Sequence, residues 1–374
     1  MKIIQVYQTN PFTHGQGGGV RYVKNLISGI KNKCDEILFL GIGNKIEQID
    51  NVKLLPITKN LTGYMPFLIN LFLKLPFMNL SDYNVVHVHR LYFAIPFILI
   101  KPRLKIVCSL HGRTFSVFKS NYGNLTLKII KPIFKFIEYF SIRNIDFLAP
   151  VSNDVLKNFK NKYKFIDNRP NQIIGSMLNL ESFGILESDY LRNLFGDENK
   201  YILFIGRLAD VKDLVFLIEM WSEKFQNNKK IKLIIAGDGE DRKKLIFLSN
   251  KICFNNQPIF IGEISPDHIP ELISSSSICV LSSKHEASPT VVKESLSCGI
   301  PVVTSNVGDV NNFIINGING YVVNKDFKSF YTAIQNLLNE PLSKEAVKGN
   351  SEENLNKCSI EFVSNQYLNI YSKV

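Results

Sequence analysis

Short runs of apolar, largely β-branched residues recur along the whole chain, with stretches of helical character between them. Strands that are apolar on both faces and alternate with helices form parallel sheets covered on both sides. The first half contains KIIQVY, EILFLGI, NVVHVH, KIVCSL, FLAPVS and QIIGSM, and the second half contains YILFIG, KLIIAG, PIFIGE, SICVLSS, IPVVTS and GYVV. The pattern predicts an α/β protein made of two doubly wound, Rossmann-like units in tandem.

A length of 374 residues allows two domains that each bury a core. The segment 179–200 has mixed polarity and no strand period, so we expect the boundary there, with one domain over 1–180 and a second over 181–356. Residues 357–374 predict an amphipathic helix that must pack on another surface. Its apolar positions are Ile360, Val363, Tyr367, Ile370 and Tyr371.

The formal net charge of +11 indicates an anionic partner, which could be a phosphorylated substrate, an anionic membrane or a nucleic acid. The six cysteines form no CxxC pair, so we expect reduced thiols in a cytoplasmic protein, with neither a zinc site nor a disulfide framework. The first residues, MKIIQVYQTN, enter a strand directly and do not resemble a signal peptide.

Three apolar stretches of the first half, 64–80, 91–108 and 126–145, are each interrupted by Lys or Pro and are too broken to span a membrane. One interpretation is that they are core helices. The other is that they form a basic, aromatic face that lies on anionic lipid, with Lys128, Lys131 and Lys135 as contributors.

Ligands of open α/β sheets bind beyond the carboxyl ends of the strands, so the residues there are the candidates for function. After the first strand, Gly18 and Gly19 precede a helix and could let backbone N–H groups approach an anion. The spacing is not GxGxxG, so we do not expect NAD or FAD. His111 leaves another strand beside a glycine, where its ring could donate a hydrogen bond. His87 and His89 have no further ligand nearby in sequence, which disfavours a metal site.

In the second half, Arg207 and Lys212 follow a strand and precede a helix, a place suited to a diphosphate. Asp238 stands between two glycines and is interpreted as a cap of the next helix. Gly262 ends a further strand, where the backbone could meet a flat base.

The segment HEASPTVVKESLSCGIPVV places Glu286 and Glu294 around a small-residue turn. A helix that begins near Pro289 or Thr290 would hold Glu294 one turn inside it and leave Glu286 in the preceding loop. Carboxylates at such a position accept hydrogen bonds from sugar hydroxyls, and the free N–H groups of the first helical turn bind phosphate.

The paired glutamates, followed by LSCGIPVV, resemble the motif of the retaining GT-B glycosyltransferases of family four. The resemblance extends to GGGVRYVKNLISGI, FIGRLADVK, IIAGDGE and SNVGDVNNFIINGINGYVV, and so covers nearly the whole chain. It implies two Rossmann-like domains facing across a cleft, with the last helix crossing back onto the first domain.

The resemblance also implies roles for these positions. Glu294 would bind the ribose hydroxyls of a nucleotide-sugar donor, and Glu286 would contact the donor sugar ring. His111 would hydrogen-bond the donor sugar close to the reacting centre. Arg207 and Lys212 would hold the diphosphate. The remaining donor contacts would come from Gly18, Gly19, Thr290 and Val291. Ala287 departs from the family, which usually has glycine there, and SMLNLES replaces the usual NGVD.

The expected activity is sugar transfer from a nucleotide diphosphate sugar, with UDP as the commonest base in the family, to an acceptor hydroxyl with retention and without a metal. The expected acceptor is a lipid-linked glycan of bacterial surface polysaccharide, such as lipopolysaccharide, used by an enzyme at the inner face of the cell membrane. A nucleotide-sugar 2-epimerase of the same fold remains an alternative. So does a non-catalytic nucleic-acid-binding protein, although no RNP, KH or helix-turn-helix motif is present.

Overall fold

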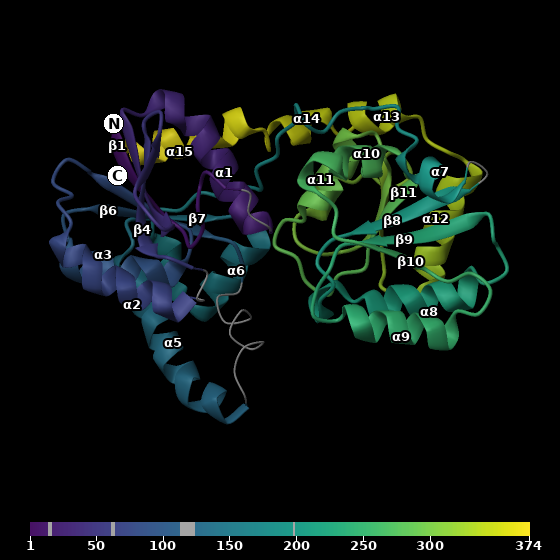
Figure 1. Ribbon diagram of the computed structural model, residues 1–374, viewed down its shortest axis with the longest axis horizontal. Helices are drawn as coiled ribbons and strands as arrows, with labels where there is room; N and C mark the ends of the chain where they lie inside the picture. Colours follow the sequence, from purple (N-terminus) through teal and green to yellow (C-terminus); the bar gives the residue numbers. More distant parts are fainter. Residues whose placement is uncertain (14–16, 61–63, 113–123, 197–198) are drawn as a thin grey trace. The chain divides into compact units, whose positions relative to one another are not determined.

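The computed structural model describes residues 1–13, 17–60, 64–112, 124–196 and 199–374, with only the backbone given over 124–131 and at 133. The chain forms two compact units (Figure 1). Unit 1 comprises Met1–Met177 together with Ile360–Val374, and unit 2 comprises Leu178–Ser359.

The sheet of unit 1 has the order β3-β4-β2-β1-β5-β6-β7. Its strands are β1 (Lys2–Val6), β2 (Glu36–Ile42), β3 (Glu47–Ile49), β4 (Val52–Thr58), β5 (Val85–Val88), β6 (Lys105–Leu110) and β7 (Phe147–Pro150). Every pairing is parallel except that of β3 with β4. The direction of winding reverses between β1 and β5, which is where doubly wound sheets bind ligands.

The helices of unit 1 cover this sheet. They are α1 (Gly18–Ile30), α2 (Tyr64–Lys74), α3 (Ala94–Ile100), α5 (Asn124–Asn144), α6 (Asn153–Lys162) and α15 (Ile360–Tyr371). The last helix packs beside α1 (Figure 1), and it buries Val363, Tyr367, Ile370 and Tyr371 in the same core as the face of α1. The amphipathic terminal helix predicted from the sequence is therefore confirmed, and it packs on the N-terminal unit.

The sheet of unit 2 has the order β10-β9-β8-β11-β12-β13, and all its pairings are parallel. The strands are β8 (Lys200–Ile205), β9 (Ile231–Ala236), β10 (Ile259–Gly262), β11 (Ile278–Leu281), β12 (Val302–Ser305) and β13 (Gly320–Val323). The helices are α7 (Tyr190–Phe195), α8 (Leu214–Lys224), α9 (Arg242–Ile252), α10 (Ile269–Ser274), α11 (Thr290–Ser297), α12 (Phe327–Asn339), α13 (Lys344–Gly349) and α14 (Glu352–Asn356). Here the winding reverses between β8 and β11.

The predicted α/β class with two parallel sheets is confirmed, but one expected strand is wrong. The run QIIGSM forms no strand and only follows the edge of β7, where Ile174 N donates to Pro150 O. A parallel ladder would need the N–H of residue 150 as well, and proline has none. The missing donor ends the pairing after a single bridge between Leu148 and Asn171.

All six cysteines are free and buried, in agreement with the sequence pattern. Among the described residues, no helix is both long enough and apolar enough to cross a membrane.

Candidate nucleotide-sugar site

A mostly buried ion pair lies at the switch point of unit 2. Lys212 belongs to a single helical turn after β8, and Glu286 belongs to the loop between β11 and α11. Lys212 Nζ lies 2.6 Å from Glu286 Oε1, and Ser283 Oγ donates to the same oxygen at 2.7 Å. The two charged side chains are only 19% and 15% exposed. Two of the predicted site residues are thus brought together, and they place a cation and a carboxylate at the edge where ligands of such sheets bind.

Further hydrogen bonds join these two loops. Ser282 Oγ donates to the carbonyl of Lys212 at 3.0 Å, and Lys284 N donates to the carbonyl of Val211 at 2.8 Å. Lys284 Nζ also contacts Asp210 at 2.7 Å. These hydrogen bonds hold together the two loops that carry Lys212 and Glu286.

Helix α11 begins at Thr290, and its N-cap is Pro289, which offers no side-chain acceptor. The first N–H groups of the helix, including those of Thr290 and Val291, therefore donate no hydrogen bond to a cap side chain and carry the positive end of the helix dipole. Glu294 lies one turn inside the helix and is 4% exposed. The predicted helix start and the placement of both glutamates are confirmed.

Arg207 and Lys212 do not act as a pair in this structure. Arg207 directly follows the turn after β8, is 72% exposed, and contacts Glu240 at 3.0 Å. Lys212 is held by Glu286 instead. Gly262 ends β10 with a φ of 76°, and a Cβ there would meet nothing within 4 Å. The loop after β10 is open at this position.

The expected role of Asp238 is wrong. Helix α9 begins at Arg242, and Asp241 occupies the N-cap position. Asp238 Oδ1 instead accepts from Gly239 N at 2.7 Å. The reason is that the loop is bonded to the loop after β8, because Leu208 N donates to Asp238 O and Asp241 N donates to Leu208 O. Helix α9 therefore begins three residues later than it would if Asp238 were its N-cap.

In unit 1, the predicted glycine loop is the start of helix α1. Gly17 is the N-cap with a φ of 97°, and Gly18 and Gly19 form the first turn. A Cβ on Gly19 would lie 2.5 Å from the hydroxyl oxygen of Tyr7, so packing alone explains that glycine. A Cβ on Gly18 would meet nothing within 4 Å, so packing does not explain this one.

His111 follows β6 and is partly buried. Its ring lies edge-on to that of Tyr22, with 4.7 Å between centroids, and its Nε2 is buried without a hydrogen-bond partner among the described residues. Burial, with a smaller contribution from Arg90, lowers the pKa of His111 to about 3. The imidazole is therefore neutral near pH 7 and has a ring nitrogen available.

His87 and His89 belong to a buried hydrogen-bonded network. His87 contacts Tyr371 OH at 2.6 Å and Ser109 Oγ at 2.8 Å, while His89 contacts Gln5 Oε1 at 2.8 Å. Burial lowers the pKa of both rings well below the usual value. Within the described residues, no three His, Cys, Asp or Glu side chains are grouped as metal ligands would be.

Two family models together match most of the chain. Residues 16–181 match the model described as Glycosyltransferase Family 4, and residues 191–354 match the model described as Glycosyl transferases group 1. The chain belongs to the group 1 glycosyltransferases. It is accordingly a hexosyltransferase with the GT-B fold.

This glycosyltransferase is similar to an uncharacterized glycosyltransferase of Methanocaldococcus jannaschii, at 26% identity over 95% of this chain and 94% of the other. It is also similar to a UDP-Gal:alpha-D-GlcNAc-diphosphoundecaprenol alpha-1,3-galactosyltransferase of Escherichia coli, at 25% identity over 68% of this chain and 66% of the other. The fold matches that of Anabaena HepE, solved with UDP-glucose, with a TM-score of 0.76, 17% identity and full coverage of both chains.

Sequence reasoning missed a buried clamp behind the site of this glycosyltransferase. Lys293 is fully buried in α11, and its Nζ lies 3.0 Å from Asp309 and 2.8 Å from Ser288 Oγ. Ser288 Oγ donates to Asp309 at 2.7 Å. Gly308 has a φ of 59°, and a Cβ there would lie 2.8 Å from Ala287 O. The loop after β12 therefore supports the loop that carries Glu286.

Arg90 is a second residue that the sequence reading missed. It follows β5 at the switch point of unit 1, and its guanidinium donates to Tyr7 OH and Tyr64 OH, each at 3.4 Å. Its Nε is buried without a partner, and no carboxylate of the described residues pairs with it. A desolvated guanidinium without a counter-ion is suited to binding an anionic group.

Proposed function

We propose that this glycosyltransferase moves a sugar from a UDP-sugar to an acceptor hydroxyl with retention at the anomeric carbon. The observation that carries the proposal is the Lys212–Glu286 pair at the switch point of unit 2, beside the uncapped start of α11. A cation and free N–H groups suit a diphosphate, and a carboxylate suits the hydroxyls of a sugar. The resemblance to family four supports the retaining outcome.

The proposed chemistry depends on stabilising the leaving group. Negative charge builds on the diphosphate as the glycosidic bond breaks, and donors that are already in place stabilise it without reorganisation. Lys212, Arg207 and the N–H groups of Thr290 and Val291 would be these donors and would stabilise the negative charge without a divalent metal. Glu294 would hold the ribose hydroxyls, Glu286 would contact the transferred sugar, and Gly262 would let the backbone approach the base.

By the same family resemblance, His111 would lie at the reacting centre, and Gly18 and Gly19 would contact the donor. His111 is neutral near pH 7 and its Nε2 has no hydrogen-bond partner among the described residues, so it can hydrogen-bond a sugar hydroxyl without adding charge. Gly18 and Gly19 present the N–H groups at the start of α1. The departing phosphate would assist deprotonation of the acceptor, so no side-chain base is required.

The names of similar proteins support a uridine donor. The relative from E. coli is named for a UDP-galactose donor and a diphosphoundecaprenol acceptor, and Anabaena HepE was solved with UDP-glucose. We extend this to a lipid-linked acceptor in bacterial surface-polysaccharide synthesis. Arg90 would bind an anionic group of that acceptor.

The proposal places the enzyme in the cytoplasm, on the inner face of the membrane, with the basic first domain toward anionic lipid. The net charge of +11 supports this placement. Lys135 is exposed on α5, whereas the side chains of Lys128 and Lys131 lie outside the described residues. The membrane contact through these lysines stays a prediction.

Two measurements test the proposal. In a thermal-shift screen of UDP-, GDP- and dTDP-sugars, we expect a UDP-sugar to raise the melting temperature most. The anomeric configuration of the product, followed by NMR during turnover, should match that of the donor. An inverted product would reject retention, and a preference for GDP or dTDP would reject the uridine donor.

A further inference from the structure

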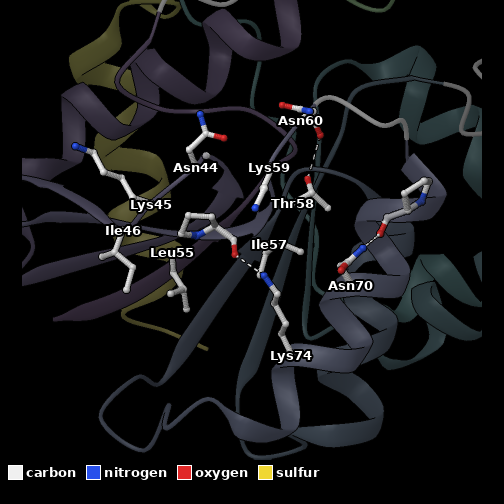
Figure 2. Close-up of a pocket in the computed structure, with 13 residues that line it drawn as sticks. Asn44, Lys45, Ile46, Leu55, Ile57, Thr58, Lys59, Asn60, Asn70 and Lys74 are labelled. Carbon is white, nitrogen blue, oxygen red and sulfur yellow. Dashed lines mark hydrogen bonds between the residues drawn. The ribbon is translucent and has the colours of Figure 1, made fainter.

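A cavity in unit 1 is lined by residues other than those assigned to the donor (Figure 2). Its volume is about 600 Å³. Its lining comes from the loop after β2, from β4 and the residues after it, and from α2. Its lining includes Asn44, Lys45, Lys59, Asn60, Asn70 and Lys74. We call it the lysine pocket.

The charge of the lysine pocket has one sign. Lys45, Lys59 and Lys74 line it, and none of its lining residues is acidic. Lys74 Nζ donates to the carbonyl of Pro56 at 3.0 Å, and no carboxylate among the described residues pairs with any of the three lysines. Ammonium groups without counter-ions around a concave surface attract a compact anion. The amides of Asn44, Asn60 and Asn70 add further donors.

Helix α2 joins this pocket to an apolar surface. Pro66, Asn70 and Lys74 line the pocket at a spacing of four residues, and the neighbouring stripe of the same helix and the turn after it carries Ile69, Leu73 and Phe77. These three side chains are 52%, 64% and 90% exposed. An exposed apolar stripe beside lysines is the pattern of a helix that lies in a membrane interface. A nucleic acid or a soluble sugar phosphate would leave the stripe without a partner.

The lysine pocket also lies at the functional edge of its sheet. It follows the carboxyl ends of β2 and β4, and β2 is the immediate neighbour of β1, whose loop leads to Gly18. Ile42 N donates to Thr9 O at 2.9 Å, which bonds the end of β2 to that loop. A group bound in the pocket would therefore lie on the same edge of unit 1 as Arg90 and His111.

We propose that the lysine pocket binds the phosphate head group of a membrane lipid, while Ile69, Leu73 and Phe77 enter the bilayer interface. The inference deepens the proposed function, because a lipid-linked acceptor has to be met at the membrane. It names a head-group site on α2 and β4, separate from the lysines of α5.

The test is cosedimentation of the full chain with phosphatidylcholine vesicles that contain or lack phosphatidic acid. We expect binding to the anionic vesicles only, weakened about tenfold or more in Lys45→Gln/Lys59→Gln, since each lysine near an anionic surface adds to the attraction. The matched charge control is Lys157→Gln/Lys164→Gln, two exposed lysines on another face of unit 1. Leu73→Ser/Phe77→Ser should also weaken binding, whereas Phe247→Ser/Phe254→Ser, equally exposed in unit 2, should not.

An equal loss of vesicle binding in the two lysine double variants would show attraction by net charge alone and would overturn the proposed head-group site. Unchanged binding in Lys45→Gln/Lys59→Gln would overturn it as well. Titration with inorganic pyrophosphate in solution distinguishes a lipid head group from a free phosphate compound as the ligand. If the double variant loses pyrophosphate binding but keeps vesicle binding, the pocket takes a free phosphate compound and the lipid assignment is wrong. UDP binding is measured on every variant, so a failure of the proposed donor chemistry is seen separately from a failure of this site.

Discussion

Lys212 Nζ and Glu286 Oε1 lie 2.6 Å apart although 74 residues separate them in the chain. The contact forms because β8 and β11 are neighbours in the sheet while the connections that follow them wind in opposite directions. The pair is mostly buried, so its geometry does not depend on salt in the way an exposed ion pair does. It gives the site one fixed cation and one oriented carboxylate before any donor binds.

Lys212→Ala should lower kcat for sugar transfer by about 10²- to 10³-fold, because it removes one preorganised donor to the leaving diphosphate. The measurement is steady-state release of the nucleoside diphosphate. Lys284→Ala is the matched control, since Lys284 contacts Asp210 in the same loop pair but has no assigned donor contact. Equal losses in the two variants would contradict the assignment.

The buried clamp predicts a stability effect that can be separated from catalysis. Asp309→Ala leaves the Lys293 ammonium buried without its carboxylate and should lower the free energy of unfolding by about 3–5 kcal/mol. The double variant Lys293→Met/Asp309→Ala removes the buried charge and should recover part of the loss. Urea denaturation of both variants measures this. A double variant less stable than Asp309→Ala would show that the charge is not the cause.

The two glycines of α1 predict opposite outcomes. Gly19→Ala should destabilise unit 1, because its Cβ would meet Tyr7 OH at 2.5 Å. Gly18→Ala has free space and a helical backbone, so its melting temperature should stay equal or rise. If Gly18 serves backbone approach to the donor, Gly18→Ala should nevertheless reduce turnover. Full activity in a stable Gly18→Ala variant would remove Gly18 from the site.

The buried histidines predict sensitivity to acid. His87, His89 and His111 have pKa values well below 6.5 in the folded chain, because burial disfavours their charged forms. Above pH 6.5 the three rings are neutral in both the folded and the unfolded chain, so they do not change the free energy of unfolding with pH. Below it only the unfolded chain takes up protons, so the free energy of unfolding should fall by up to about 1.4 kcal/mol per pH unit for each ring.

Melting temperatures between pH 7.5 and 5.5 test this expectation. A flat profile of the wild type over that range would mean that the three rings can be protonated without unfolding.

The sequence was sufficient for the parts of the fold that local pattern determines. Apolar runs predicted the two parallel sheets, and the spacing from Ile360 to Tyr371 predicted the helix that packs on unit 1. The start of α11 followed from Pro289 and Thr290. The order of strands, and with it the contact of Lys212 with Glu286, is a tertiary property that no local spacing specifies.

The errors have specific physical causes. The run QIIGSM has the composition of a strand, but Pro150 in its neighbour lacks the N–H that a ladder requires. Asp238 has the residue type of a helix cap, but its loop is bonded to Leu208. Lys293 and Arg90 were missed because a single cation in a sequence gives no sign of burial or of the partners it meets.

The most direct test of the donor site is the affinity for UDP, measured by calorimetry on the wild type and on Glu294→Ala. Hydrogen bonds to a charged group contribute about 1.5–3 kcal/mol, so the variant should bind UDP roughly 10- to 150-fold more weakly. Glu271→Ala, an exposed glutamate of the same unit, should bind as the wild type does. Equal UDP affinity in the wild type and Glu294→Ala, or no binding by the wild type, would contradict the account.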